Sequence, residues 1–408
     1  MQSDPPSPVR RRIAVLSTSR ADYGHLYWVL RDLQAADDVD LRIIATGAHM
    51  APTFGQTVDQ FTEHGFDVEA RLECQLDSDS DIGMAKTIGV SILGLADVLG
   101  RLRPDLLLLI ADRYEMLAPA ATALALRIPI AHIEGGEISE GAIDDAVRNA
   151  MTKLSHLHFV STEQARRRVL AMGEEAWRVQ RAGAPSLDHL RRSRLGDRRQ
   201  LEQLLKLSLD SPPVIVAYHP VTLVQDSHSE VEALFAALET LREPVIFCFP
   251  NADTGHQAII ERARSFCRDH PGARLNTNLD LFDFWTLLRH ASAMVGNSSS
   301  GIMETPSLEL PFVNIGDRQR GRERATNVID VPGEHQAIVE ALQRARSAAF
   351  RTGITGMTNP YGDGRAAERI VRALRHCPLG ESLLIKRAVP LAADGSPAFA
   401  QHACPPEG

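Results

Sequence analysis

Short uninterrupted runs of apolar residues alternate with longer amphipathic segments along the first half of the chain. Runs of this length are typical of strands that are buried on both faces of a parallel sheet. They predict strands at 13–17, 41–46, 106–110, 129–133 and 158–161. Between them, apolar positions with helical spacing predict helices at 25–33, 82–102, 114–126 and 144–154.

The second half of the chain repeats this alternation. The runs predict strands at 214–218, 245–249, 293–296 and 312–315. The segments between and after them predict helices at 230–241, 255–269, 281–290 and 335–345. Strands that alternate with helices imply right-handed crossover connections and doubly wound parallel sheets. The predicted fold class is therefore α/β.

The boundary between the two halves is expected within 183–210. An arginine-rich helical stretch at 191–206 leads there into Ser211-Pro212-Pro213, which is a strong turn signal. The expected domains are a disordered arm at 1–12, a Rossmann-like domain at 13–190 and a second one at 191–360. Two such domains place a ligand cleft between them, outside the carboxyl ends of their strands.

Composition narrows the classes of function. The 408 residues carry a formal net charge of −8 and 5% aromatic residues, so neither nucleic acid nor an anionic membrane surface is an expected partner. An uninterrupted apolar run of about 18 residues, which a membrane-spanning helix needs, is absent, and 1–12 lacks the apolar core of a signal peptide. The five cysteines form no Cys-x-x-Cys pair and are expected to be reduced thiols in a cytoplasmic protein.

The usual nucleotide-binding motifs are missing, since no G-x-G-x-x-G follows the first strand and no P-loop sequence occurs. Instead, Gly296-Asn297-Ser298-Ser299-Ser300-Gly301 stands where a predicted strand ends and a helix begins. Backbone amides and serine hydroxyls there could seat a phosphate, or the residues could simply cap the helix. Glu304, expected on the first turn of that helix, could bind a ribose diol or only stabilise the helix dipole.

Other charged residues follow predicted strands and face the same cleft. Arg20 could bind a diphosphate through its guanidinium, or form a loop salt bridge with Asp22. His219 follows the strand at 214–218 and could donate to a phosphate or act as an acid, although most single histidines do neither. The four arginines within 318–324 offer local positive charge, or only a solvated charged run.

Carboxylates occur at three successive strand-to-helix junctions. Asp112 follows the strand at 106–110, Glu134 follows the next strand, and Asp144 opens the following helix. Carboxylates that share a site push their pKa values apart, which suits general acid and base catalysis. Helix capping is the alternative for Asp144, and solvated loop charges are the simplest interpretation of Glu137 and Glu140. No HExxH motif or Cys/His cage is present, so no metal site is expected.

These residues lie in longer strings that resemble the hydrolysing UDP-N-acetylglucosamine 2-epimerases of bacterial sialic- or legionaminic-acid synthesis. The strings are TSRADYGHL (18–26), ADRYEMLAPA (111–120), IPIAHIEGGEISEGAIDDAVRNAMTKLSHLHFVSTE (128–163), GAPSLD (183–188), YHP (218–220), VGNSSSGIMETPSL (295–308), NIGDRQRGR (314–322) and NPYGDGRAAERI (359–370). Several strings of this length in the family's order are far more specific than any one short motif.

The resemblance implies a GT-B fold, in which a helix at 361–376 crosses back to the first domain. The last residues, 377–408, lose the helical and strand periodicity and are expected to form a tail. The resemblance also implies that UDP is eliminated from the sugar to leave a glycal, which water then attacks, so that UDP and N-acetylmannosamine form without a cofactor. The matching positions imply catalytic roles for Asp112, Glu134 and Asp144. The implied UDP-sugar contacts are Arg20, Arg113, His219, Asn251, Ser298, Ser299, Gly301, Glu304 and Arg322.

Several alternatives remain open at this point. Members of the same family act on UDP-2,4-diacetamido-2,4,6-trideoxyglucose, and the sequence does not identify the residues that select the sugar. A non-hydrolysing epimerase, a GT-B glycosyltransferase and a nucleotide-sugar binding protein without turnover are the other hypotheses. The resemblance also implies a homodimer or homotetramer.

Overall fold

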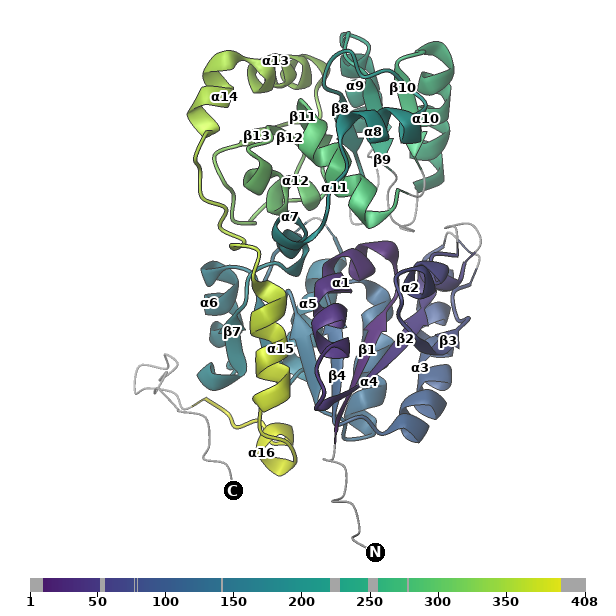
Figure 1. Ribbon diagram of the computed structural model, residues 1–408, viewed down its shortest axis with the longest axis vertical. Helices are drawn as coiled ribbons and strands as arrows, with labels where there is room; N and C mark the ends of the chain where they lie inside the picture. The colour runs from purple at the N-terminus through teal and green to yellow at the C-terminus, as the bar shows by residue number, and fades with distance from the viewer. Residues whose placement is uncertain are drawn as a thin grey trace, which may run out of the picture.

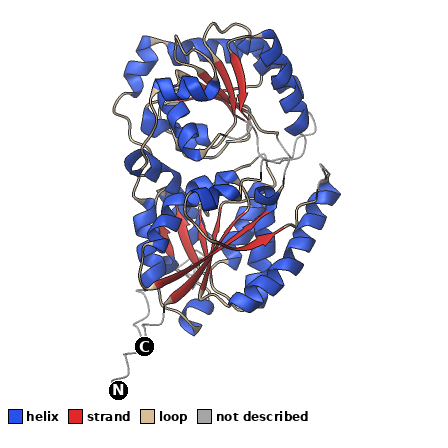
Figure 2. Cartoon of the chain, turned by 45° about the vertical axis from the view of Figure 1, so that its right-hand side comes forward, coloured by secondary structure: helices blue, strands red, loops and turns tan. Residues whose placement is uncertain are grey.

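The computed structural model describes residues 10–51, 56–76, 78, 80–140, 142–220, 228–248, 256–276 and 279–389. In this part of the chain, two parallel sheets build two domains that are stacked one above the other in Figure 1. In Figure 2 helices flank the strands of each sheet. The predicted α/β fold class with two doubly wound domains is confirmed.

The first sheet has seven parallel strands in the order β3-β2-β1-β4-β5-β6-β7. Its strands are β1 (Arg11–Ser17), β2 (Val39–Thr46), β3 (Val68–Leu72), β4 (Leu106–Ile110), β5 (Ile130–Ile133), β6 (Leu157–Val160) and β7 (Val179–Arg181). Its helices are α1 (Arg20–Gln34), α2 (Asp59–Glu63), α3 (Asp81–Leu102), α4 (Leu117–Ala125), α5 (Asp144–Leu154) and α6 (Glu163–Ala171). The central strand β4 reads Leu-Leu-Leu-Leu-Ile and is buried throughout, as a strand covered on both faces should be.

The second sheet has six parallel strands in the order β10-β9-β8-β11-β12-β13. Its strands are β8 (Val214–Ala217), β9 (Val245–Cys248), β10 (Ala273–Asn276), β11 (Ala293–Gly296), β12 (Phe312–Ile315) and β13 (Val328–Val331). Helices α7 (Asp188–Arg192) and α8 (Arg198–Leu205) precede it, and α9 (His228–Leu238), α10 (His256–Asp269), α11 (Leu281–His290), α12 (Ser300–Met303), α13 (His335–Arg346) and α14 (Ala348–Ile354) complete the domain. The stretch 191–206, predicted as one helix, contains the end of α7 and the whole of α8, with the non-helical residues 193–197 between them.

The order of strands reverses direction once in each sheet, between β1 and β4 and between β8 and β11. At such a switch point the loops after neighbouring strands diverge and leave a crevice at the carboxyl ends. The residues that follow β1, β4, β8 and β11 are therefore those that the fold itself brings to the cleft.

The end of the chain returns to the first domain, as the resemblance implied. Helix α15 (Ala366–His376) packs against α1, and the carboxylate of Asp188 accepts hydrogen bonds from the amides of Ala366 and Ala367 at its start. The segment after 376 was expected to be a tail, but the part of it that the structure describes, up to residue 389, packs on the first domain. There α16 (Glu381–Leu384) follows, and buried Arg178 donates to the carbonyl oxygens of Ser382, Leu383 and Ile385.

Helix α3 differs from the expectation about membrane helices. Over an 18-residue window its mean hydropathy is 1.6, and by length and composition alone this 22-residue helix is long and apolar enough to cross a membrane. The expectation was based on uninterrupted apolar runs, which Lys86 and Asp97 break. One face of α3 packs on the first domain through Leu95, Val98 and Leu99.

Candidate active site

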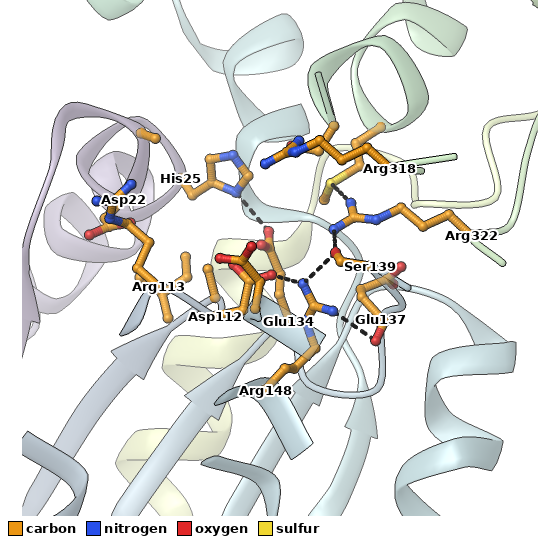
Figure 3. Close-up of a pocket in the computed structure, with 16 residues that line it drawn as sticks. Asp22, His25, Asp112, Arg113, Glu134, Glu137, Ser139, Arg148, Arg318 and Arg322 are labelled. Atoms are coloured by element: carbon orange, nitrogen blue, oxygen red, sulfur yellow. Dashed lines mark hydrogen bonds and ion pairs between the residues drawn. The ribbon is translucent and has the colours of Figure 1, made fainter. Parts of the chain in front are cut away.

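The three predicted carboxylates line one pocket at the carboxyl edge of the first sheet. Figure 3 labels two of them, Asp112 and Glu134. Asp112 follows β4, Glu134 follows β5 and Asp144 is the first residue of α5. The other lining residues come from both domains: Ala21, Asp22, His25, Ile110, Ala111, Arg113, Glu137, Ser139, Arg148, Ser299, Met303, Arg318 and Arg322. The pocket is therefore lined by both acidic and basic side chains, and both domains contribute to it.

Two residues at these strand ends have a left-handed backbone conformation, which residues other than glycine rarely adopt. Ala111 has a φ of 62° and Glu134 has a φ of 68°. Their amides are fixed by the neighbouring strands, because Ala111 donates to the carbonyl oxygen of Ile133 at 3.0 Å and Glu134 to that of Phe159 at 2.8 Å. Strain of this kind costs about 1–3 kcal/mol per residue and concentrates at functional sites. Here it turns Asp112 and Glu134 out of the sheet edge into the pocket.

Glu134 is held by a histidine that the sequence analysis did not single out. His25 Nδ1 lies 2.7 Å from Glu134 Oε1, and His25 Nε2 lies 3.8 Å from Glu304 Oε1 of the second domain. Burial disfavours the imidazolium, but the two carboxylates outweigh it and raise the pKa of His25 to about 9. Burial also opposes ionisation of Glu134, yet His25 and Arg322 hold the pKa of Glu134 below its ordinary value. Glu134 is therefore a buried, ionised carboxylate at neutral pH.

Asp112 forms an ion pair with the buried guanidinium of Arg148, which the sequence analysis also missed. Arg148 lies one helical turn after Asp144 on α5, and that spacing was the available signal. The same guanidinium donates to the carbonyl oxygen of Glu137 at 2.9 Å and to Ser139 Oγ at 3.3 Å. These bonds tie the loop after β5 to the carboxylate after β4 (Figure 3).

Glu137 is buried in the pocket, so the interpretation as a solvated loop charge was wrong. Its side chain is 4% exposed, and Tyr361 Oη lies 3.5 Å from its Oε2. Burial raises the pKa of Glu137 to about 7, with Arg322 opposing the shift. A carboxyl group with that pKa can give and accept a proton near neutral pH. Glu137 and Glu134 thus form a pair of carboxyl groups whose environments drive their pKa values apart.

Arg20 and Asp22 do not pair with each other. Asp22 accepts hydrogen bonds from the Thr18 amide, Thr18 Oγ1 and the Ser19 amide, and so caps the start of α1. Arg20 is the first residue of α1, and its Nη1 donates to the carbonyl oxygen of Leu279 in the second domain at 3.1 Å. Burial lowers the pKa of Arg20, with Cys248 and Asp280 opposing it. Arg20 thus reaches across the cleft to the second domain instead of forming a salt bridge with Asp22.

The serine-rich loop after β11 faces the pocket from the second domain. Ser299 lines the pocket and precedes α12, which spans only Ser300–Met303. Glu304 was expected on the first turn of a longer helix, but it caps the end of this short one, because Pro306 cannot continue the α-helical hydrogen bonding. Ser186 Oγ donates to Glu304 Oε1 at 2.6 Å, which leaves this buried carboxyl group beside His25.

Close contacts at this loop explain why two of its positions are glycine. A side chain at Gly296, whose φ is 139°, would lie 2.0 Å from the carbonyl oxygen of Ala217. A side chain at Gly301 would lie 2.3 Å from the ring of Phe312, so the structure gives Gly301 a packing role. Asn297 joins the loop to the end of β8, since its side chain bonds the amide and the carbonyl oxygen of His219 at 2.7 and 2.8 Å.

The remaining predicted contacts are distributed as follows. Arg113 lines the pocket but also pairs with buried Glu115 at 2.8 Å. Arg322 donates to the carbonyl oxygen of Ile138 at 2.8 Å and to Ser139 Oγ at 3.2 Å, across the cleft. His219 and Ser298 are buried beside the pocket rather than among its lining residues. Asn251 lies outside the described residues. Among the residues that the structure describes, no group of histidine, cysteine and carboxylate side chains is arranged to hold a metal ion.

Comparison with known proteins gives the family. A family model described as UDP-N-acetylglucosamine 2-epimerase matches residues 31–375. The chain is 37% identical over 377 residues to the UDP-N,N'-diacetylbacillosamine 2-epimerase (hydrolyzing) of Legionella pneumophila, covering 92% of this chain and 98% of that protein. It is 33% identical over 339 residues to a UDP-N-acetylglucosamine 2-epimerase of Neisseria meningitidis, covering 83% and 88%.

A solved structure also shares the fold. The UDP-GlcNAc 2-epimerase from Neisseria meningitidis, in a crystal structure with UDP-GlcNAc, superposes with a TM-score of 0.75 at 20% identity. The match covers 89% of this chain and 99% of that one, which confirms the GT-B-type arrangement of the two domains. By sequence and fold, the chain belongs to the UDP-N-acetylglucosamine 2-epimerase family.

Proposed function

We propose that the protein is a hydrolysing 2-epimerase of a UDP-linked 2-acetamido sugar. The observation that carries this proposal is the shared pocket, in which Asp112, Glu134 and Asp144 face cationic and serine-bearing loops of the second domain. The carboxylates supply proton transfer at the sugar ring, while Arg318, Arg322 and the serine loop offer positive charge and donors for the departing diphosphate. The groups for proton transfer and the groups that stabilise the departing diphosphate thus lie in the same cleft.

The proposed reaction has two steps. A carboxylate removes the proton from carbon 2, the bond from carbon 1 to the diphosphate oxygen breaks, and UDP leaves with that electron pair, so that a glycal remains. Water then adds across the double bond, with its oxygen at carbon 1 and a proton delivered to carbon 2 from the opposite face. One water is consumed, and UDP and the free 2-epimeric sugar are released.

The pKa values suit a division of labour among the carboxyl groups. Glu134 is ionised at neutral pH and can accept a proton or stabilise positive charge at carbon 1. Glu137, with a pKa of about 7, can hold the proton that must return to the sugar. Asp112 is oriented by Arg148, and Asp144 faces it from the start of α5. In this arrangement either Asp112 or Asp144 can be the base that removes the proton from carbon 2, and the other then activates the attacking water.

Proton NMR in deuterated buffer tests the reaction. We expect free sugar with the 2-epimeric configuration, one equivalent of UDP, and deuterium at carbon 2. Asp112→Asn, Glu134→Gln and Asp144→Asn should each lower kcat by at least about 100-fold while the folded state persists, because acid–base groups contribute this much or more. Full activity in all three variants, or UDP binding without turnover of any sugar, would refute the proposal.

The sugar is the finer part of the proposal. The 37% identity to the Legionella pneumophila protein, against 33% to the Neisseria meningitidis protein, favours a 2,4-diacetamido trideoxy sugar over N-acetylglucosamine. A competition experiment with both UDP-sugars in one tube gives the ratio of their kcat/KM values directly. A ratio above about 10 in favour of either sugar, equivalent to about 1.4 kcal/mol in the transition state, would assign the substrate.

A further inference from the structure

Tyr361 connects the pocket to the segment that crosses between the domains. This crossing segment, residues 355–365, runs from the end of α14 to the start of α15. The Tyr361 ring is fully buried in an apolar cluster that belongs mostly to the second domain. Its hydroxyl group nevertheless reaches the loop after β5, because Tyr361 Oη lies 3.5 Å from Glu137 Oε2. A buried phenol beside a carboxyl group affects which protonation state of that group is favoured.

The backbone around Tyr361 is fixed from both sides. Its carbonyl oxygen accepts a hydrogen bond from the Ala184 amide at 2.7 Å, and its amide donates to Asn359 Oδ1 at 2.9 Å. The approach is close, since a Cβ at Gly183, whose φ is 93°, would lie 3.1 Å from the Tyr361 carbonyl oxygen. The Asn359 side chain donates in turn to the carbonyl oxygen of Met303, a pocket residue. The hydroxyl group is therefore held at a defined place beside the pocket.

The direction of the Tyr361 hydroxyl proton follows from its two neighbours. Tyr361 Oη lies 2.9 Å from the carbonyl oxygen of Glu323, which can only accept, and 3.5 Å from Glu137 Oε2. A phenol has a single proton to donate, so this proton goes to the nearer carbonyl oxygen. A lone pair of Oη is then left to face Glu137. A protonated Glu137 can donate to this lone pair, whereas an ionised Glu137 would face it without a donor.

The charged groups around Glu137 act in opposite directions. Burial raises the pKa of Glu137 to about 7, Glu134 and Glu323 act in the same direction, and Arg322 and Arg168 oppose them. With a pKa this close to neutral pH, one added hydrogen bond changes the protonated fraction several-fold. The other carboxyl oxygen of Glu137, Oε1, is buried and has no hydrogen-bond partner within the described residues, so it remains available to the sugar.

We propose that Tyr361 is a positioning residue that keeps the proton on Glu137, and that this proton is required for hydration of the glycal. The inference rests on the proposed function. In the hydration step the proton of Glu137 moves to carbon 2, the π electron pair forms the new C–H bond, and the oxygen of water bonds to carbon 1. The proton that this water loses goes to Asp112 or Asp144, whichever did not remove the first proton. Of the two protons that these aspartates then hold, one returns to Glu137 and the other passes to solvent.

Proton NMR of the products at two pH values tests the proposal. Tyr361→Phe removes the hydroxyl group and keeps the ring, so the pKa of Glu137 should fall by about half a unit or more. At pH 8 we expect the ratio of released glycal to 2-epimeric sugar to rise at least about 3-fold over the wild type, and at pH 6 to match it closely. The basic limb of kcat/KM should move to lower pH by the same amount. A purely structural defect would slow elimination and hydration together and leave the ratio unchanged.

Two further variants define the range of the result. Glu137→Gln has no proton to give, so it should release mainly glycal at both pH values. Tyr218→Phe is the matched control, because Tyr218 is also buried and its Oη donates to a carboxylate, Glu230 Oε2, at 2.6 Å. Tyr218 is not among the residues that line the pocket. Its replacement should leave the product ratio and the basic limb as in the wild type.

Urea denaturation tests the contact without any turnover. Glu137→Gln should raise the free energy of unfolding more at pH 8 than at pH 5, because only the ionised carboxyl group is costly in the folded state. In the Tyr361→Phe background this pH-dependent gain should be smaller, since a lower folded-state pKa leaves less stability to recover. In the Tyr218→Phe background the gain should be the same as in the wild type.

Three results would overturn the proposal. They are a basic limb in Tyr361→Phe that stays in place or moves to higher pH, an unchanged ratio of glycal to sugar, and an unchanged pH-dependent gain from Glu137→Gln. A limb that moves to higher pH would show that Tyr361 donates its proton to Glu137 instead. A wild type that turns over no UDP-sugar would refute the proposed function and with it the role in hydration, whereas the urea measurement would still show whether Tyr361 holds the proton of Glu137.

Discussion

A single imidazole links the two halves of the pocket. His25 stands between Glu134, which follows a strand of the first domain, and Glu304, which caps a helix of the second. Without its charge, two buried carboxyl groups would face each other, and Arg322 would be the main cation left to favour the ionisation of Glu134. The ionisation of Glu134 therefore depends on a residue that lies 109 positions away in the sequence.

Replacing His25 with asparagine should change the pH profile of the reaction. The cation that lowers the pKa of Glu134 is lost, so this pKa rises and the acid limb of kcat moves to higher pH by about one unit or more. The measurement is kcat against pH for the wild type and His25→Asn. His376→Asn, at an exposed histidine of α15, is the control. An unshifted acid limb in His25→Asn would show that Glu134 is not the group that this limb reports.

Replacing Glu137 with glutamine should stabilise the protein at high pH. The folded-state pKa of about 7 lies above the ordinary 4.5, so the folded state binds the extra proton and the wild type loses stability as pH rises from 4.5 to 7. Glu137→Gln removes this loss, which amounts to about 3 kcal/mol above pH 7 and vanishes near pH 4.5.

Urea denaturation at pH 5 and pH 8 measures this difference. Glu140→Gln is the control, because the Glu140 side chain is 54% exposed on the same loop and should give no pH-dependent gain. A gain in Glu137→Gln of the same size at both pH values would contradict the buried-carboxyl explanation.

At the scale of elements, the strands that the sequence did not predict are β3, β7, β10 and β13, and all four are sheet edges. Their sequences are VEARL, VQR, ARLN and VIDV, which mix charged and apolar residues because one side of an edge strand faces solvent. The predicted strands were the inner ones, whose burial on both faces demands continuous apolar runs. The hydrophobic pattern therefore predicted the inner strands of each sheet but not its edge strands.

The same reasoning applies to the site. Asp112, Glu134 and Asp144 could be predicted because parallel strands bring their carboxyl ends to one edge, so position in the chain determines position in space. Their partners could not be predicted in this way. The pairs His25–Glu134 and Arg148–Asp112 depend on how α1 and α5 rotate against the sheet, and no local pattern encodes that rotation.

A buried carboxylate also anchors the C-terminal segment. Glu174 lies 2.6 Å from Lys153 Nζ, 2.7 Å from Lys386 Nζ and 3.2 Å from His158 Nε2. Burial opposes its ionisation, but these partners outweigh it and lower the pKa of Glu174 to about 2. The stability that this carboxylate contributes is present above pH 4.5 and is lost as pH falls towards 2.

Glu174→Gln should therefore destabilise the protein at pH 7 by about 3 kcal/mol and remove part of its loss of stability in acid. Hydrogen exchange gives the local readout, since the amides of α16 should lose protection first when Lys386 loses its partner. Glu175→Gln is less suitable as a control because Arg178 binds Glu175 directly. Exposed Glu381→Gln is the better one, and equal loss of protection in both variants would contradict the anchor.

At the scale of the whole molecule, the loop after β12 holds the two domains together over the pocket. Arg322 bonds Ile138 and Ser139 across the cleft, and Arg168 of the first domain donates to the carbonyl oxygen of Gly321 at 3.3 Å. Arg322→Ala should raise KM by about 10- to 100-fold, because hydrogen bonds from a charged group are worth about 1.5–3 kcal/mol.

Small-angle scattering and steady-state kinetics check this expectation together. Arg322→Ala should show a larger radius of gyration in the absence of substrate, while Arg320→Ala should match the wild type. Arg320 is on the same loop, but its side chain is 68% exposed and lies 3.6 Å from Glu140, so it contributes little. If Arg322→Ala and Arg320→Ala had identical kinetics, the rise in KM would come from the loss of positive charge alone and not from the hydrogen bonds that Arg322 makes across the cleft.

The return of α15 to the first domain has a consequence for the order of folding during synthesis. The core of the first domain includes Ala366, Ile370, Leu374 and Leu383, so it remains incomplete until these residues have been translated. The second domain draws its core from residues that all emerge earlier. On the ribosome, the domain whose synthesis starts first is therefore completed after the second domain, and the apolar surface that α15 covers stays exposed until α15 has been made.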